Sequence, residues 1–125
     1  LEPLQIRALE TVRELRAGGF SLDGRYYLTP ADTNAISVLD LQARAIAAEV
    51  PARVFGGSTG TAFRHPTHGP VWATSTMVDN ELLVLGTDPD AHPDNAWQVV
   101  ERAAGPAAGS LFLATHPASP HLWMD

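Results

Sequence analysis

The stretch Ser58–Thr87, STGTAFRHPTHGPVWATSTMVDNELLVLGT, predicts three consecutive strands joined by two turns. The first turn is HPTHG, residues 65–69, in which Pro66 suits the second position of a type I turn and Gly69 suits the left-handed conformation that closes a hairpin. The second turn is Asp79-Asn80, and both residue types tolerate the positive φ of a two-residue hairpin loop. We therefore expect a three-stranded antiparallel meander here.

The residues before this stretch predict two helices that flank one hairpin. Apolar residues recur at helical spacing from Leu1 to Ala17, and Asp23-Gly24 favours a tight hairpin turn. Thr29-Pro30 is typical of a helix start, with threonine as the cap and proline in the first turn. An apolar stripe follows and predicts a helix to about Val50, ended by Pro51.

The residues after this stretch predict a third helix, a short strand and an irregular tail. The helix spans about Pro93 to Ala104 and buries Trp97. The strand spans Leu111 to Ala114, and the tail from about residue 115 is too rich in proline for regular structure. Within the meander, the uninterrupted apolar run Leu82–Leu85 indicates a central strand covered on both faces.

Together these elements predict one α+β domain over residues 1–125. Its antiparallel sheet would consist of the three-stranded meander, the N-terminal hairpin and the C-terminal strand, with about three helices packed on it. No internal repeat is evident. The order of elements, and above all the strand, acidic turn and helix of Glu81–Ala104, resembles small regulatory domains of the roadblock and longin type. This resemblance is one of layout, and it implies a regulatory role without assigning functional residues.

Composition excludes several classes of function. A chain of 125 residues with 45% hydrophobic and 18% charged residues is typical of one globular domain. The net charge of −6, with the eight basic residues scattered, argues against a nucleic-acid partner. All eight are arginines, a usage typical of bacterial GC-rich coding, and there is no cysteine, so Schiff-base and thiol chemistry are excluded. No apolar run reaches the roughly 18 residues of a membrane span, so we expect a cytoplasmic protein.

The glycine-rich segment GGSTG, residues 56–60, matches the G-x-S-x-G pattern that presents a nucleophilic serine in hydrolases. Ser58 would be the nucleophile, and Asp88 and His116 follow it in the hydrolase order. A nucleophile elbow leads into a helix, however, and the sequence predicts a strand after Ser58. We therefore expect a glycine-rich strand entry, with Ser58 and His116 as the candidates for a catalytic alternative.

Two histidines on the first turn are the candidate binding residues. His65 and His68, three positions apart, can both reach one metal ion, and His121 is a candidate third ligand. Histidines on an exposed turn without a metal are the more common case. Trp72, on the adjoining strand, is positioned to line a pocket beside them, so His65, His68 and Trp72 form the expected binding set.

The leading hypothesis is a non-enzymatic regulatory, ligand-sensing or protein-interaction domain without a cofactor, because no complete catalytic constellation is present. Its partner would be another protein, a second copy in a homodimer, or a small ligand. One alternative is a small hydrolase or metal-dependent enzyme that uses Ser58 and the histidines. Another is the soluble part of a pilin-like or secreted protein, since the sequence starts at Leu1 and not at a methionine.

Overall fold

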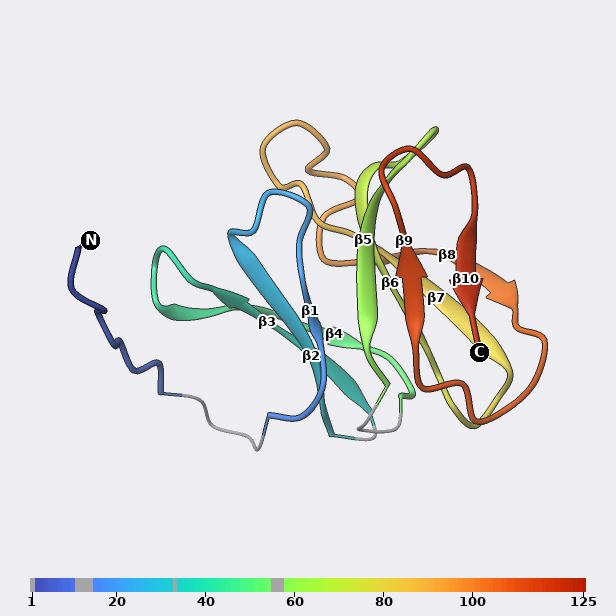
Figure 1. The fold of residues 1–125 in the computed structure, drawn as a ribbon. Coiled ribbons are helices and arrows are strands. Elements are labelled where there is room, and N and C mark those ends of the chain that lie inside the picture. The colour runs from blue at the N-terminus through green and yellow to red at the C-terminus, as the bar shows by residue number, and fades with distance from the viewer. Residues whose placement is uncertain (1, 11–14, 33, 55–57) are drawn as a thin grey trace.

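The computed structural model describes residues 2–10, 15–32, 34–54 and 58–125, and these residues form strands and turns without a helix (Figure 1). The strands are β1 (Gly19–Phe20), β2 (Tyr26–Asp32), β3 (Ala35–Asp40), β4 (Ala45–Pro51), β5 (Gly60–His65), β6 (Gly69–Ser75), β7 (Glu81–Gly86), β8 (Val99–Ala104), β9 (Leu113–Thr115) and β10 (Leu122–Met124). Within the described ranges, no helix is long and apolar enough to cross a membrane.

The strands form three antiparallel sheets that repeat one unit. Sheet A has the order β1-β2-β3-β4 and sheet B the order β5-β6-β7-β8, so each is a meander whose strands lie in chain order. Sheet C pairs β9 with β10. The first strands of the three sheets, β1, β5 and β9, pack side by side (Figure 1). The chain thus contains a structural repeat that its sequence does not reveal.

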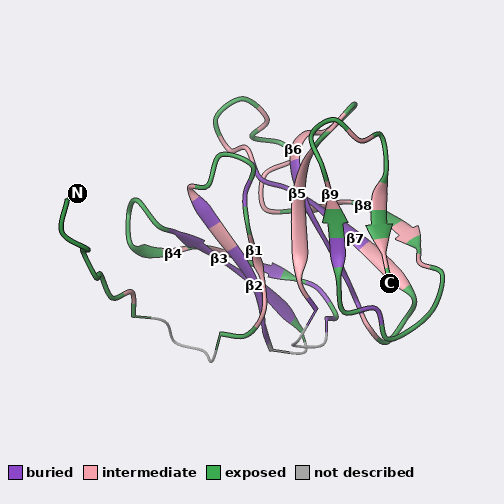
Figure 2. Cartoon of the chain, in the orientation of Figure 1, coloured by how far each residue is buried: buried purple, intermediate pink, exposed green. Residues whose placement is uncertain are grey.

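Sheet B lies between the other two sheets and has a hydrophobic core on each face. One core joins it to sheet A and includes Leu28, Ile36, Trp72, Leu83 and Leu85. The other core joins it to sheet C through the buried residues Val71, Ala73, Val84 and Leu113. Successive residues of β7 therefore point into different cores, which confirms that this apolar run is a strand covered on both faces. Figure 2 shows the buried residues within the sheets and the exposed residues at the turns.

Two glycines allow sheets A and B to approach closely beside Trp72. A Cβ atom on Gly60 would overlap the Trp72 ring, and one on Gly19 would meet the Gly60 carbonyl oxygen at 2.5 Å and Trp72 Nε1 at 2.7 Å. The tryptophan side chain is fully buried. Because only glycine leaves this space, these two positions fix how β1 and β5 pack over the ring.

The predicted α+β class with three packed helices is wrong, because the described residues are all-β. The segment expected as a helix from residue 30 to 50 forms the last three residues of β2, all of β3 and all but the last residue of β4, and its residue 33 lies outside the described residues. All six residues of β3 are buried, so the strand shows no alternation of burial, and its apolar positions also fit a helical stripe. In β4 the alternation is present, with Ile46, Ala48 and Val50 turned inward.

The other two predicted helices are also replaced. Residues 93–98 form turns that lead into β8, and Trp97, expected inside a helix, has a φ of 60° and packs edge-to-face on Tyr26 with ring centroids 4.6 Å apart. Residues 2–10 and 15–18 form neither helix nor strand, and residues 1 and 11–14 of the first predicted helix lie outside the described residues.

The meander between residues 58 and 87 forms as β5, β6 and β7, and its turn chemistry behaves as expected. Gly69 has a φ of 73° and Asn80 a φ of 53°, and Gly24 in the first hairpin has a φ of 74°. The second turn is longer than expected, because Thr76 accompanies Met77–Asn80 between the strands and Thr76 N–H donates to the Glu81 carbonyl at 2.9 Å. In this chain, residue patterns typical of turns thus predicted the structure better than residue patterns typical of helices.

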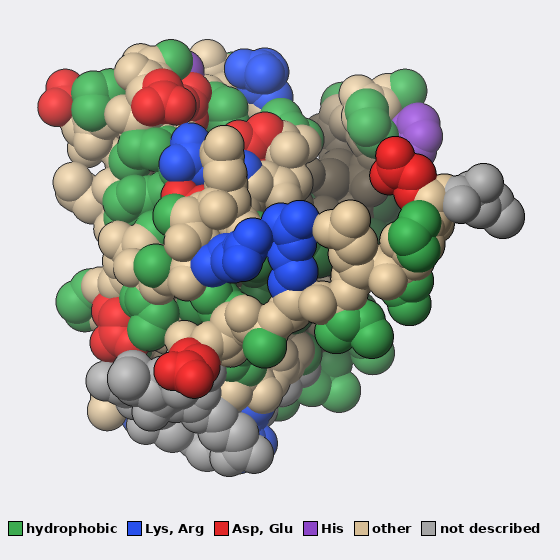
Figure 3. Space-filling model, turned by 90° about the vertical axis from the view of Figure 1, so that its left-hand side faces the viewer, with side chains coloured by type: hydrophobic (Ala, Val, Ile, Leu, Met, Phe, Trp, Pro, Cys, Tyr) green, Lys and Arg blue, Asp and Glu red, His purple; other side chains and the backbone are tan. Residues whose placement is uncertain are grey.

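The surface seen from the side of sheet A is of mixed character (Figure 3). Basic and acidic side chains lie near one another there, with apolar side chains between them. This face therefore carries no continuous surface of one charge.

Candidate functional site

The turns β1–β2, β5–β6 and β9–β10 lie at one end of the molecule, together with the long connection from β7 to β8 (Figure 1). A cleft of about 630 Å³ opens there, within the range of clefts that bind small molecules. Its apolar lining residues are Leu22, Ala62, Phe63, Pro66, Pro117, Pro120 and Leu122. Its polar lining residues are Arg64, Thr115, His116, Ser119 and His121. We call it the first cleft.

His116 lines the first cleft, and a backbone hydrogen bond determines which of its ring nitrogens carries the proton. The Ala118 backbone N–H donates to His116 Nδ1 at 3.1 Å. A neutral imidazole carries one proton, and an accepting Nδ1 requires that proton to be on Nε2. Within the described part of the chain, His116 Nε2 has no hydrogen-bond partner. His116 therefore offers the cleft an imidazole N–H donor without a protein partner among the described residues.

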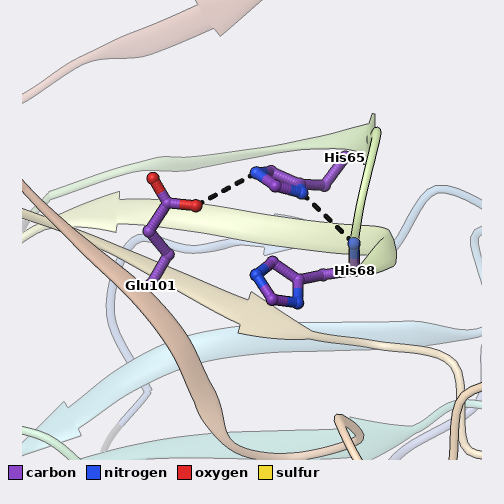
Figure 4. Close-up of side chains that lie close together, drawn as sticks. All are labelled: His65, His68 and Glu101. Carbon is purple, nitrogen blue, oxygen red and sulfur yellow. Dashed lines mark hydrogen bonds and ion pairs between the residues drawn. The ribbon is translucent and has the colours of Figure 1, made fainter.

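His65 occupies the equivalent turn of sheet B, but both of its ring nitrogens are engaged (Figure 4). The backbone N–H groups of Thr67 and His68 donate to His65 Nδ1 at 3.1 and 3.2 Å. On the other side of the ring, Nε2 lies 3.0 Å from Glu101 Oε2. With Nδ1 accepting, Nε2 carries the proton and donates it to the carboxylate. His65 thus joins the β5–β6 turn to β8.

His65, His68 and Glu101 place three potential metal-ligand atoms within 4.8 Å of one another. A histidine that binds a metal through one nitrogen normally donates the N–H of the other to an acceptor. His65 Nδ1 instead faces two N–H donors, so coordination through Nε2 would require the turn to change its hydrogen bonds. In this arrangement, His65 connects the β5–β6 turn to Glu101 of β8. His121, the third ligand candidate, lines the first cleft beside His116 instead.

A second cleft, of about 260 Å³, adjoins the first, and Leu22 and Arg64 line both. Its other lining residues are Asp23, Tyr26, Pro70, Thr87, Asp88, Pro89 and Asp90. Burial raises the pKa of the Tyr26 hydroxyl. Hydrogen bonds from the Ala91 backbone and from His92 lower the pKa of Asp88. Arg64 is thus the cation between an apolar cleft and an acidic one.

Ser58 and Trp72 lie away from both clefts. The Ser58 hydroxyl is fully buried, 3.1 Å from Thr74 Oγ1 and donating to the Ser75 carbonyl at 3.1 Å. It faces strand β6, and His116 is not among its partners. Gly56 and Gly57 of the hydrolase-like motif lie outside the described residues. Trp72 packs between sheets A and B, and its Nε1 has no partner among the described residues.

Sequence reasoning missed Glu101, Arg64 and Leu22. Glu101 was placed on a helix, so no contact with His65 was expected. Arg64 precedes His65 on β5. The sequence does not reveal that this side chain is exposed, because its exposure depends on how the sheets pack. The dipeptide His-Pro occurs at residues 65–66, 92–93 and 116–117, and its first and third occurrences lie on equivalent turns of successive sheets.

Comparison with known proteins gives consistent results. A family model described as the cytochrome D1 heme domain matches residues 1–125. A nitrite reductase from Stutzerimonas stutzeri is 30% identical over 132 residues, which cover 100% of this chain and 24% of that protein. A solved structure, of the dihydro-heme d1 dehydrogenase NirN in complex with DHE, has a TM-score of 0.72 and 22% identity, and covers 94% of this chain and 24% of that chain.

The chain therefore spans about a quarter of the length of these relatives. The likeness to the solved structure concerns the fold. Successive four-stranded antiparallel sheets, with their first strands side by side, are the arrangement of blades in a β-propeller. Sheets A and B correspond to two such blades and sheet C to the first two strands of a third.

Proposed function

Because this chain belongs to the cytochrome D1 heme domain family, we propose that it forms part of the wall of a d1-type haem site in a redox protein. This proposal replaces the expectation of a non-enzymatic regulatory or interaction domain, which the family match and the two relatives contradict. The hydrolase and pilin-like alternatives are replaced as well. Those alternatives depended on Ser58, on the histidines and on the identity of residue 1. The family match does not depend on these residues.

The lining of the first cleft fits one side of a haem macrocycle. A haem offers two broad apolar faces, a central iron and carboxylate side chains at its edge. Leu22, Phe63 and the prolines of the two His-Pro turns supply apolar surface that excludes water from a flat ligand. Arg64 supplies a cation and His116 an imidazole. The lining of the first cleft therefore contains apolar, cationic and imidazole groups that complement the parts of a haem.

The observation that carries the proposal is the contrast between the two His-Pro turns. His65 uses both ring nitrogens within the protein, whereas His116 uses only Nδ1 and holds a proton at Nε2 in the cleft. A haem when bound supplies an iron that exchanges electrons and binds small ligands. His116 supplies a hydrogen-bond donor there through its Nε2–H group.

The test is a titration of the full-length protein with haem d1, followed by the absorbance of the haem. We expect saturable binding with a shifted absorbance maximum, and we expect His116→Ala to weaken it or to change the spectrum of the bound haem. A single hydrogen bond of this kind corresponds to roughly a fivefold change in Kd. The matched control is His68→Ala, which removes an imidazole that does not line either cleft.

Three results would count against the proposal. The first is haem d1 that remains unbound, with an unshifted spectrum. The second is binding of the His116→Ala variant with the affinity and spectrum of the unaltered protein. The third is an equal loss in both variants, which would indicate a general effect on folding at this end of the molecule.

A further inference from the structure

Two prolines of the first cleft, Pro66 and Pro117, each follow a histidine that caps its own turn. In the β9–β10 turn, Ala118 N–H donates to His116 Nδ1 at 3.1 Å. In the β5–β6 turn, His65 Nδ1 accepts the equivalent N–H, two positions on, at 3.1 Å and the next N–H at 3.2 Å. The ring nitrogen thus takes the place that an aspartate or asparagine oxygen has in an Asx turn.

The connection from β7 to β8, at the same end of the molecule, contains the same cap made by a carboxylate. Asp88 precedes Pro89, and its Oδ1 accepts the N–H groups of the two residues after the proline, Asp90 and Ala91, at 3.1 and 3.0 Å. The Ala91 amide first, and then His92, lower the pKa of Asp88. This cap therefore persists in mildly acidic solution, whereas an ordinary imidazole gains its second proton between about pH 5 and 8.

Protonation removes the histidine caps, because the nitrogen that accepts the backbone N–H is the one that gains the proton. A neutral imidazole accepts at one nitrogen and donates at the other, whereas an imidazolium donates at both. At His65 the new proton on Nδ1 would face two N–H donors, and at His116 it would face one. Both turns are therefore capped only while their histidine is neutral.

The groups that face His65 keep its ring close to β8. Glu101 Oε2 lies 3.0 Å from Nε2, and an imidazolium keeps that bond (Figure 4). The His68 ring lies beside the His65 ring, with ring centroids 4.6 Å apart. The His92 ring packs against the end of the turn, where a Cβ atom on Gly69 would lie 2.6 Å from His92 Cε1. Protonation of His65 therefore frees the backbone of the turn while the ring stays with Glu101.

The charged and titratable groups that share the first cleft with His116 are Arg64 of β5 and His121 of its own connection. In the part of the chain that the structure describes, no carboxylate forms an ion pair with His116. Protonation of His116 therefore leaves its turn uncapped and adds a second cation to the cleft lining, which already contains Arg64.

We propose that the β5–β6 and β9–β10 turns form an acid-sensitive rim of the first cleft, in which neutral His65 and neutral His116 cap the turns and protonation of either histidine uncaps its turn. Because Pro66 and Pro117 directly follow the two histidines, uncapping displaces residues of the cleft lining. This inference goes beyond the proposed function, since it concerns the shape of the cleft and does not depend on what the cleft binds.

The experiment measures backbone hydrogen exchange of the full-length protein from about pH 7.5 to about pH 5, with millisecond labelling and mass spectrometry. Protection is calculated at each pH relative to an unstructured peptide, which removes the intrinsic pH dependence of exchange. We expect the amides of Thr67, His68 and Ala118 to lose about fivefold in protection at the lower pH, the scale of one hydrogen bond. The amides of Asp90 and Ala91 are the internal control and should keep their protection.

The variants replace the titrating acceptor by one that does not titrate in this range. His65→Asn and His116→Asn each keep an oxygen that can accept the turn N–H groups, and each should abolish the acid response of its own turn alone. His65→Asp and His116→Asp copy the cap made by Asp88 and form a second pair with the same expected result. The matched control is His68→Asn, which removes the neighbouring imidazole and should leave both responses in place.

The inference is wrong if protection at Thr67, His68 and Ala118 does not change with pH. An equal loss at Asp90 and Ala91 would also overturn it, because the acid effect would then be a general loosening of this end of the molecule. So would a loss that persists in the asparagine and aspartate variants of the same turn. A response abolished by His68→Asn would assign the titration to His68, and a response in only one turn would refute the shared role of the two histidines.

Discussion

At the scale of single residues, Asp40 shows how one carboxylate holds a turn that the sequence assigned to a helix. Its Oδ2 accepts from Arg25 at 2.8 Å, and its Oδ1 accepts the backbone N–H groups of Gln42 and Ala43 at 2.9 Å. These bonds close the turn from β3 to β4, where Arg44 has a φ of 56°. They all favour the ionised carboxylate, so the Arg25 guanidinium first, and then the turn amides, lower the pKa of Asp40.

This pairing predicts a pH-dependent stability. Because the folded-state pKa of Asp40 lies below its ordinary value of 3.8, its stabilising contribution is complete above that value and is lost as the pH falls through the folded-state pKa. We expect Asp40→Asn to lower the melting temperature at pH 7, and the difference from the unaltered protein to shrink under more acidic conditions. Thermal unfolding followed by circular dichroism over a pH series checks this.

The control for this series is Asp94→Asn, which changes an exposed carboxylate outside the turn. It should leave the melting temperature nearly unchanged at every pH. A melting-temperature difference for Asp40→Asn that persists undiminished at the lowest pH would contradict the assignment, because the loss would then be one of packing.

At the scale of elements, the β5–β6 turn is fastened to β8 through His65. We expect His65→Ala to lower the free energy of unfolding by about 1–3 kcal/mol, because two backbone N–H groups and Glu101 lose their partner. His65→Asn should recover part of this loss, since an asparagine oxygen can accept the turn N–H groups. Urea unfolding at constant m-value measures both variants. Equal losses in the two variants would refute the capping role of Nδ1.

The same scale shows what sequence can predict in this protein. The turns were predictable because each depends on a few residues with special backbone preferences, as at Gly24, Gly69 and Asn80. The strand β3 was not, because a fully buried strand loses the alternation that identifies strands, and its apolar positions continued at helical spacing into β4. Where both faces of a segment are buried, its apolar sequence pattern therefore fits a helix and a strand equally well.

The candidate site was predictable in its residue types and not in its grouping. His116 was singled out together with Ser58, and it instead lies with His121 of the same β9–β10 connection and with Arg64 of β5. His65 and His68 do lie together, with Glu101 from β8 as the third group. Such groupings follow from the packing of β1, β5 and β9, which depends on Trp72 and on the absence of a side chain at Gly60.

At the scale of the whole molecule, sheet B is the only one of the three sheets with a described hydrophobic core on both faces. Backbone amides exchange slowly where opening would expose buried apolar surface. We expect the slowest hydrogen exchange in β3, β6 and β7 and the fastest in β10, whose residues are exposed or half-buried. Exchange detected by mass spectrometry checks this order. Protection of β10 equal to that of β6 would contradict it.

The first cleft takes its lining from residue 22, from residues 62–66 and from residues 115–122. Protein synthesis delivers these segments in that order. A segment must include residues 22–122 to present the complete lining. Whatever occupies the cleft can therefore meet its complete lining only after residue 122 has been synthesised.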